Sequence, residues 1–103
     1  MADRTAEDQA LLEDVKRYLN AEWEEDGKIV NLINAAKAYL DSKRGAPADY
    51  SQPGFPRTLL FDHVRYHRDN ALDVFENNYR HLILAMQTER RADDADDEEE
   101  PES

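Results

Sequence analysis

The chain of 103 residues has no cysteine, three glycines, four prolines and no long apolar run. The lack of cysteine excludes disulfides, thiolate metal ligands and cysteine nucleophiles. The apolar runs fall short of the roughly 18 residues that a membrane span needs, and residues 1–4 lack the apolar stretch of a signal peptide. We therefore expect one small, soluble, cytoplasmic domain, because a chain of this length has room for a single core.

Basic residues are few: 13 Lys and Arg stand against 24 Asp and Glu, which gives a net charge of -11. Residues 92–103 hold eight of these carboxylates and no base, so residues 1–91 carry a net charge of only -3. The like charges of residues 92–103 repel each other, and no large apolar side chain offsets them. We predict a folded domain over residues 1–91 and a disordered acidic tail over residues 92–103.

Strand signals are missing, whereas apolar residues recur at helical spacing along most of the chain. A first helix is predicted over residues 6–21, with Thr5 and Asp8 at its start in the spacing of a capping box. A second helix is predicted from Asp26 to Gly45, whose freedom to adopt the left-handed conformation suits a helix end. The apolar stripe assigned to the first helix comprises Leu11, Leu12, Val15, Leu19 and Trp23.

Proline and glycine between residues 45 and 56 predict a loop in the middle of the chain. A third helix of about 20 residues is expected to begin at Pro56, because proline is favoured in the first turn of a helix. The apolar residues that follow it recur at steps of three or four, which places them on one face. A fourth helix is predicted from Tyr79 to near Arg90, after a break at Asn77 and Asn78. The third stripe comprises Leu60, Val64, His67, Ala71 and Phe75. The predicted fold class is therefore all-α: a small bundle of about four helices with a Pro/Gly-rich loop and an acidic tail.

Candidate chemistry is sparse. His63 and His67 are four residues apart, as in zinc-binding helices, but no glutamate lies between them, and Arg65 and Arg68 would repel a cation. We interpret the two histidines as partly buried or interfacial residues. No carboxylate pair stands out as an acid and base, and each glycine stands alone rather than in a phosphate-binding loop. We predict a protein that is no enzyme and needs no metal or cofactor.

Arginine and aromatic residues are the candidates for protein contacts, because interfaces favour Arg, Tyr and Trp. All six basic residues between positions 55 and 91 are arginines. The run from Arg65 to Arg68 suits an interface, and it also suits a helix surface with i,i+4 pairs such as Arg65 with Asp69. The aromatic residues, Trp23 among them, are interpreted as core or core-edge residues before partner anchors. The predicted interface residues are Arg57, Arg65, Tyr66, Arg68 and Arg80.

The order of these elements resembles a known family. Residues 12–19 have the pattern Leu-x-x-Val-x-x-Tyr-Leu, an acidic turn follows, and residues 29–40 end in Ala-Ala-x-x-Tyr-Leu. This succession is similar to the opening of phage head-tail connector proteins, which are small head-completion proteins. Residues 59–66 and 70–79 are similar to the later helical part of that family. The resemblance covers residues 11 to 87 and leaves out the acidic tail.

The resemblance implies an all-helical structural subunit that catalyses no reaction. Such subunits form a homo-oligomeric ring, a dodecamer that matches the twelvefold portal protein, and they dock the stopper or tail-completion protein. Genomic DNA passes through the ring without specific binding, and no membrane is involved. The expected location is the head-tail interface of the virion, with the host cytoplasm before assembly. The alternative from the residues alone is an acidic interaction protein of a phage or plasmid, such as a regulator or adaptor whose carboxylates imitate DNA phosphates.

Overall fold

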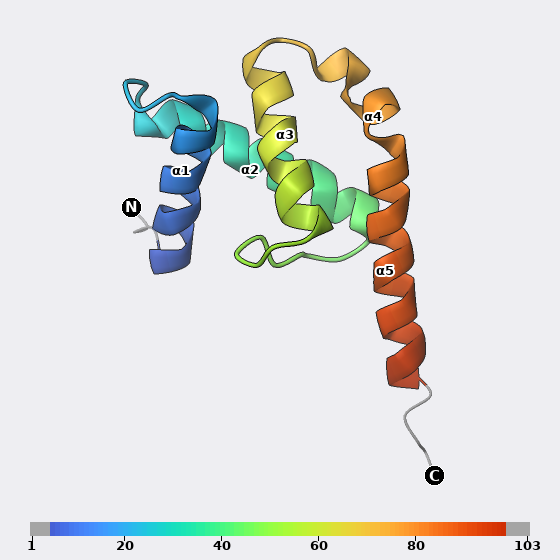
Figure 1. Cartoon of the computed structure of the whole chain (residues 1–103). Helices are drawn as coiled ribbons and strands as arrows, with labels where there is room; N and C mark the ends of the chain where they lie inside the picture. The colour runs from blue at the N-terminus through green and yellow to red at the C-terminus, as the bar shows by residue number, and fades with distance from the viewer. Residues whose placement is uncertain (1–4, 99–103) are drawn as a thin grey trace.

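The computed structural model describes residues 5–98, and this part of the chain contains helices and connecting turns but no strand. The predicted all-helical class is therefore confirmed. Figure 1 shows long helices at steep angles to one another, with two short segments between the third and the last. The elements are α1 (Ala6–Leu19), α2 (Asp26–Arg44), α3 (Phe55–Arg68), the 3₁₀ helix η1 (Leu72–Val74), α4 (Phe75–Asn78) and α5 (Arg80–Glu98).

The first two helices begin and end for local reasons that the sequence carries. The Thr5 hydroxyl accepts a hydrogen bond of 3.0 Å from the Asp8 amide, which caps α1 as the capping-box spacing predicts. Asn20 ends α1 in the left-handed conformation, with φ at 62°. Gly45 ends α2 in the same region, with φ at 90°, as predicted. These signals fix the length of α2, which at 19 residues spans about 28 Å.

The loop between α2 and α3 is fastened to α2 by the carboxylate of Asp41 and by Arg44, which donates to the Pro47 carbonyl at 2.7 Å. Asp41 accepts hydrogen bonds from the Ala48 amide at 3.0 Å and from the Tyr50 hydroxyl at 2.7 Å. Tyr50 is buried in the core, and its pKa is raised by that burial and by the bond to Asp41. The loop thus contributes a large side chain to the core.

The third helix is shorter than the predicted 20 residues, since α3 ends at Arg68. Asn70 adopts the left-handed conformation with φ at 61°, and the Ala71 amide bonds back to the Tyr66 carbonyl at 2.8 Å. The chain then turns through η1 and α4, so that the buried Phe75 packs against Tyr66 of the preceding helix with a ring centroid distance of 5.5 Å. The predicted single helix was wrong because packing of Phe75 requires the chain to fold back.

The last helix begins at Arg80, close to the predicted start, and continues to Glu98 instead of ending near Arg90. The helix thus includes residues 92–98, which were predicted to lie in the acidic tail, and the disorder of that tail stays a prediction. Ala92 and Ala95 have the highest helix propensity of any residue type, and no proline or glycine interrupts this segment. The final part of the predicted tail, residues 99–103, lies outside the described residues.

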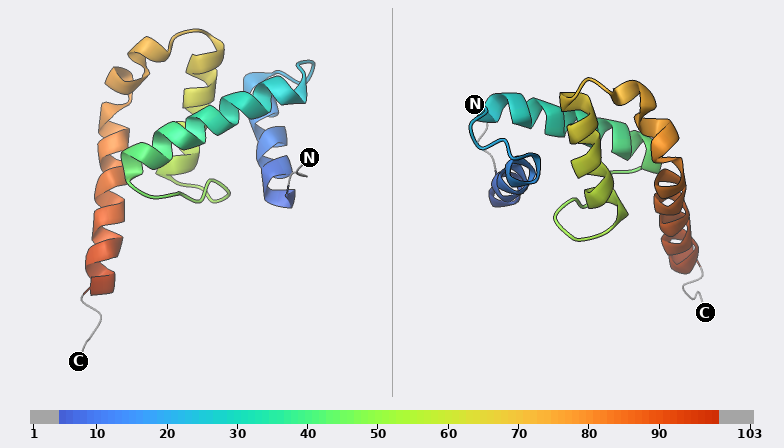
Figure 2. Two further views of the ribbon diagram at one scale, coloured as in Figure 1. Left: turned by 180° about the vertical axis from the view of Figure 1, so that it is seen from behind. Right: turned by 45° about the horizontal axis from the view of Figure 1, so that its top comes forward.

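The core lies where α1, α3 and α5 pack against α2, which crosses the molecule (Figure 2). Its side chains are almost all aliphatic, and most are completely buried. The fully buried large residues are Phe75, Leu12, Ile29, Leu40, Leu59, Leu60, Met86, Val15 and Val64. Burial of each such aliphatic side chain contributes about 1.5–3 kcal/mol, so this set dominates the stability of the fold.

The molecule is elongated because the second half of α5 runs past the other helices, as Figure 1 shows. Its extents are 56 × 33 × 21 Å, and its radius of gyration is 15.3 Å. A compact domain of this length would have a radius of gyration of about 13 Å. Within residues 5–98, none of the helices is long and apolar enough to cross a membrane.

Candidate protein-binding surfaces

Arg57, in the first turn of α3, connects that helix to two other parts of the molecule. Its guanidinium donates to Asp14 of α1 at 2.7 Å and to the Tyr50 carbonyl at 3.0 Å. It also lies 4.8 Å from the ring centre of Phe61. The hydrogen bond from Arg57 is the main cause of the lowered pKa of Asp14. Arg57 therefore stabilises the packing of α3 against α1, and its donors are used within the chain.

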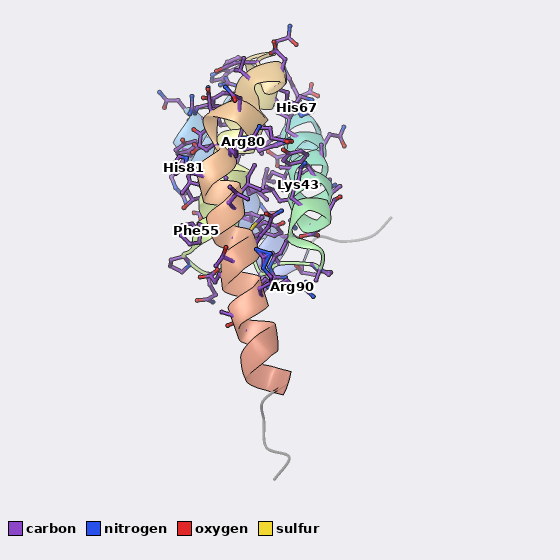
Figure 3. The ribbon with its side chains drawn as sticks, turned by 90° about the vertical axis from the view of Figure 1, so that its right-hand side faces the viewer. Lys43, Phe55, His67, Arg80, His81 and Arg90 are labelled. Carbon is purple, nitrogen blue, oxygen red and sulfur yellow. The ribbon has the colours of Figure 1, made fainter. Side chains whose placement is uncertain are left out.

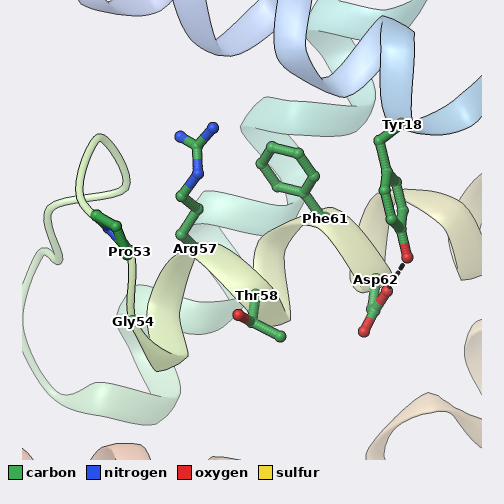
Figure 4. Close-up of a pocket in the computed structure, with 7 residues that line it drawn as sticks. All are labelled: Tyr18, Pro53, Gly54, Arg57, Thr58, Phe61 and Asp62. Carbon is green, nitrogen blue, oxygen red and sulfur yellow. Dashed lines mark hydrogen bonds between the residues drawn. The ribbon is translucent and has the colours of Figure 1, made fainter.

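Beside Arg57 lies a pocket of about 320 Å³ (Figure 4). The Tyr18 hydroxyl donates a hydrogen bond to Asp62 at one side of it, and the rings of Tyr18 and Phe61 meet edge to face at 5.3 Å. Burial, followed by the bond to Asp62, raises the pKa of Tyr18. The pocket is lined by Tyr18, Pro53, Gly54, Arg57, Thr58, Phe61 and Asp62. It has an apolar wall, and the polar groups of Tyr18, Asp62 and Arg57 already bond within the chain, which suits contact with a side chain of another protein.

Arg65 and Tyr66 of α3 contact the segment that folds back after this helix. Arg65 donates to the Tyr79 hydroxyl at 3.3 Å and lies 3.7 Å from an Asp62 carboxylate oxygen. The Tyr66 hydroxyl accepts a hydrogen bond of 3.2 Å from the side-chain amide of Asn78. Both predicted interface residues thus help to hold α4 and the start of α5 against α3.

Arg68, in the last turn of α3, bonds to the turn between α1 and α2. Its guanidinium lies 2.8 Å from Glu24, which also pairs with Lys28 at 3.2 Å. Burial disfavours the charged carboxylate, but Lys28 and Arg68 outweigh it and lower the pKa of Glu24. The side chain of Glu24 is only 6% exposed, so the pair is a structural contact between distant segments.

Arg80 differs from the other predicted interface arginines. It lies at the start of α5, is exposed, and forms no ion pair with any described residue between positions 5 and 98. It borders a groove of about 160 Å³ between α5 and the end of α2, together with Lys43 and the half-exposed Leu84 (Figure 3). Lys43 pairs across this groove with Glu76 at 3.0 Å. The remaining lining residues are Ile83 and Gln87.

Trp23 does not lie in the core, although its spacing predicted a place in the apolar stripe of the first helix. Because α1 already ends at Leu19, Trp23 lies in the following turn, and its side chain is 78% exposed. The signal that could have found it is Asn20, since a left-handed asparagine ends the helical register there. An isolated exposed indole is a candidate anchor for another protein.

His63 and His67 are packing residues in the described structure. His63 is buried between Tyr39 and Phe75, each at a ring centroid distance of 4.9 Å. The Nδ1 atoms of both histidines are buried without a hydrogen-bond partner among the described atoms. Burial, with a smaller effect of His67, lowers the pKa of His63 to about 4. Among the residues that the structure describes, no group of three or more potential ligands could hold a metal.

Comparison of the chain with family models, with curated proteins and with solved structures finds no match.

Proposed function

We propose that this protein is a structural head-tail connector of a phage, a head-completion subunit that forms a ring beneath the portal protein. It catalyses no reaction. The ring provides the surface on which the stopper or tail-completion protein docks, and genomic DNA passes through it without specific binding. The assembled protein belongs to the head-tail interface of the virion.

The observation that carries this proposal is the projecting helix α5. It extends past the body of the molecule, and it presents Arg80 and the half-exposed Leu84 to the outside. A helix that lacks a neighbour along part of its length is suited to side-by-side packing with another subunit. The order of helices that resembles the connector family ends in this same helix.

Most of the predicted interface arginines bond within their own chain, which supports a role in which DNA passes without being bound. Arg57, Arg65 and Arg68 bond to side chains and backbone groups of their own chain, chiefly to carboxylates. Phosphate contacts by free Lys and Arg provide most of the affinity of ordinary DNA-binding proteins. A subunit with a net charge of -11 instead repels the DNA backbone.

One observation favours a second candidate, a protein that imitates DNA. Such a protein needs carboxylates on its surface along a regular element, and the helical backbone of α5 continues through the acidic residues 93–98. Under this proposal the acidic end of α5 would bind a basic partner in place of DNA. The connector remains the first choice because it accounts for the whole succession of helices rather than for one end.

The test uses the full-length chain and the portal protein encoded in the same gene neighbourhood. Native mass spectrometry of the mixture is expected to show a closed ring of this chain bound to the portal, with as many copies as the symmetry of the portal requires. The chain alone is expected to be a monomer or small oligomer at low concentration. Absence of portal-dependent assembly, or of portal, capsid and tail genes beside its own, would remove the proposal. Salt-sensitive capture by a DNA-binding protein would favour the mimic.

A further inference from the structure

The two ends of α2 carry features of opposite character. The turn before α2, residues 20–25, presents the exposed Trp23 together with Glu22 and Glu25, which are exposed and form no ion pair with a described residue. We refer to residues 22–25 as the acidic tip. Tryptophan is the residue most enriched among energetically dominant interface residues, and surrounding carboxylates select for a basic partner.

The other end of α2 borders the groove formed with α5. Lys43, in the last turn of α2, and Arg80 of α5 are the cations of this groove, and Glu76 is its single carboxylate. Ile83 and the half-exposed Leu84 provide its apolar wall. The groove has a volume of about 160 Å³, close to the roughly 150 Å³ of a cavity that takes up benzene, so it has room for one six-membered ring of a partner side chain. We call it the α2-α5 groove.

We propose that the acidic tip of one copy of this protein inserts Trp23 into the α2-α5 groove of the next copy. The occupant is a second copy because the chain provides both halves of the contact: an exposed indole with carboxylates, and a groove with an apolar wall and an excess of cations. The inference rests on the proposed function, for which it names the contact between subunits.

The geometry requires the contact to be between molecules. Tip and groove lie at opposite ends of α2, which spans about 28 Å and whose two ends are seen in Figure 2. The tip of one copy therefore does not reach its own groove. A contact between two different surfaces repeats from copy to copy, and it produces a ring when the rotation per subunit closes.

The first test uses two variants that each damage one half of the contact. Trp23→Ala removes the anchor and keeps the groove, whereas Arg80→Glu reverses a groove cation and keeps the tip. Each alone is expected to weaken self-association at least about 30-fold, as for a dominant interface residue. The matched control is Val74→Ala, which shortens another exposed apolar side chain outside both surfaces and leaves association nearly unchanged.

A mixture of the two variants separates this contact from any other. Arg80→Glu chains offer an intact tip to the intact grooves of Trp23→Ala chains, and neither can add a further copy. Sedimentation is expected to show dimers in the mixture and monomers in each variant alone. Wild-type assembly combined with a purely monomeric mixture would overturn the inference.

A covalent trap covers the case of weak association. The chain has no cysteine, so Glu25→Cys with Gln87→Cys introduces one thiol at the tip and one beside the groove. Oxidation is expected to give a ladder of disulfide-linked multimers, whereas Asn34→Cys with Gln87→Cys, with its first thiol on an exposed site of α2, gives none. Portal-bound rings without a ladder would overturn this contact and leave the connector function in place. Failure to form rings with portal would instead remove the connector function, whatever the ladder shows.

Discussion

On the side of the molecule formed by α1 and α3, two arginines are paired with carboxylates of the same chain, whereas on α5 a cation and an apolar side chain face outward. Arg57 pairs with Asp14 at 2.7 Å and Arg68 with Glu24 at 2.8 Å. Arg80 has no ion pair with a described residue, and Leu84 is 52% exposed. The difference teaches that composition alone does not mark an interface: similar arginines stabilise the fold in one region and remain accessible in the other.

The sharpest contrast between the regions is expected from shortening one leucine in each. Leu60 is fully buried in α3, so Leu60→Ala should lower the free energy of unfolding by about 2–5 kcal/mol through lost burial and a cavity. Leu84→Ala on α5 should change it by less than about 0.5 kcal/mol, since surface substitutions rarely cost more. Urea denaturation followed by circular dichroism measures both. Equal losses would show that Leu84 belongs to the core.

Acid should destabilise the region around His63. The pKa of His63 is lowered to about 4 in the folded protein, so the unfolded chain, with a pKa near 6.5, binds the proton first. The contribution of neutral His63 to the free energy of unfolding is therefore fully present above pH 6.5. It falls by about 2–3 kcal/mol as the pH drops toward 4. His63→Leu should remove that part of the pH dependence, and the exposed His81→Leu should not. Thermal unfolding at several pH values checks this, and identical pH profiles for wild type and His63→Leu would contradict it.

Two arginines provide the next comparison. Arg68→Ala leaves the nearly buried carboxylate of Glu24 with Lys28 alone, and it should cost about 1–2 kcal/mol of stability. Arg80→Ala should cost less than about 0.5 kcal/mol, because an exposed cation without a close partner contributes little to the fold. Chemical denaturation of both variants gives the two values. A larger loss for Arg80 than for Arg68 would reverse the assignment of the two regions.

The smallest effect is expected from truncation after Arg91. Among the side chains of α5 that the structure describes, Met86 is the last buried core residue, and residues 91–93 are exposed. The truncated chain should keep its helical body, with a change in unfolding free energy below about 0.5 kcal/mol. A melting temperature lowered by many degrees would show that the domain boundary lies further along the chain.

The sequence predicted those elements whose ends depend on local signals. Thr5, Asn20 and Gly45 bound α1 and α2, although the predicted helix ran past Asn20 to residue 21 and Trp23 was assigned to its apolar stripe. The break after α3 was missed because apolar residues continue at helical spacing from Val64 to Phe75 across it. The sequence also did not predict the partners of the arginines, because Arg57 and Arg68 pair with residues more than 40 positions away along the chain. Such pairs depend on the crossing of the helices, which no local pattern encodes.

Hydrogen-deuterium exchange of the full-length protein, free and assembled, tests most directly whether α5 and the acidic tip contact other molecules while the remaining surface serves the fold. The account predicts that assembly slows exchange in residues 80–91 and 20–26, and leaves residues 6–19 and 55–68 as in the free protein. Slowed exchange confined to α1 or α3, with α5 unchanged, would contradict it.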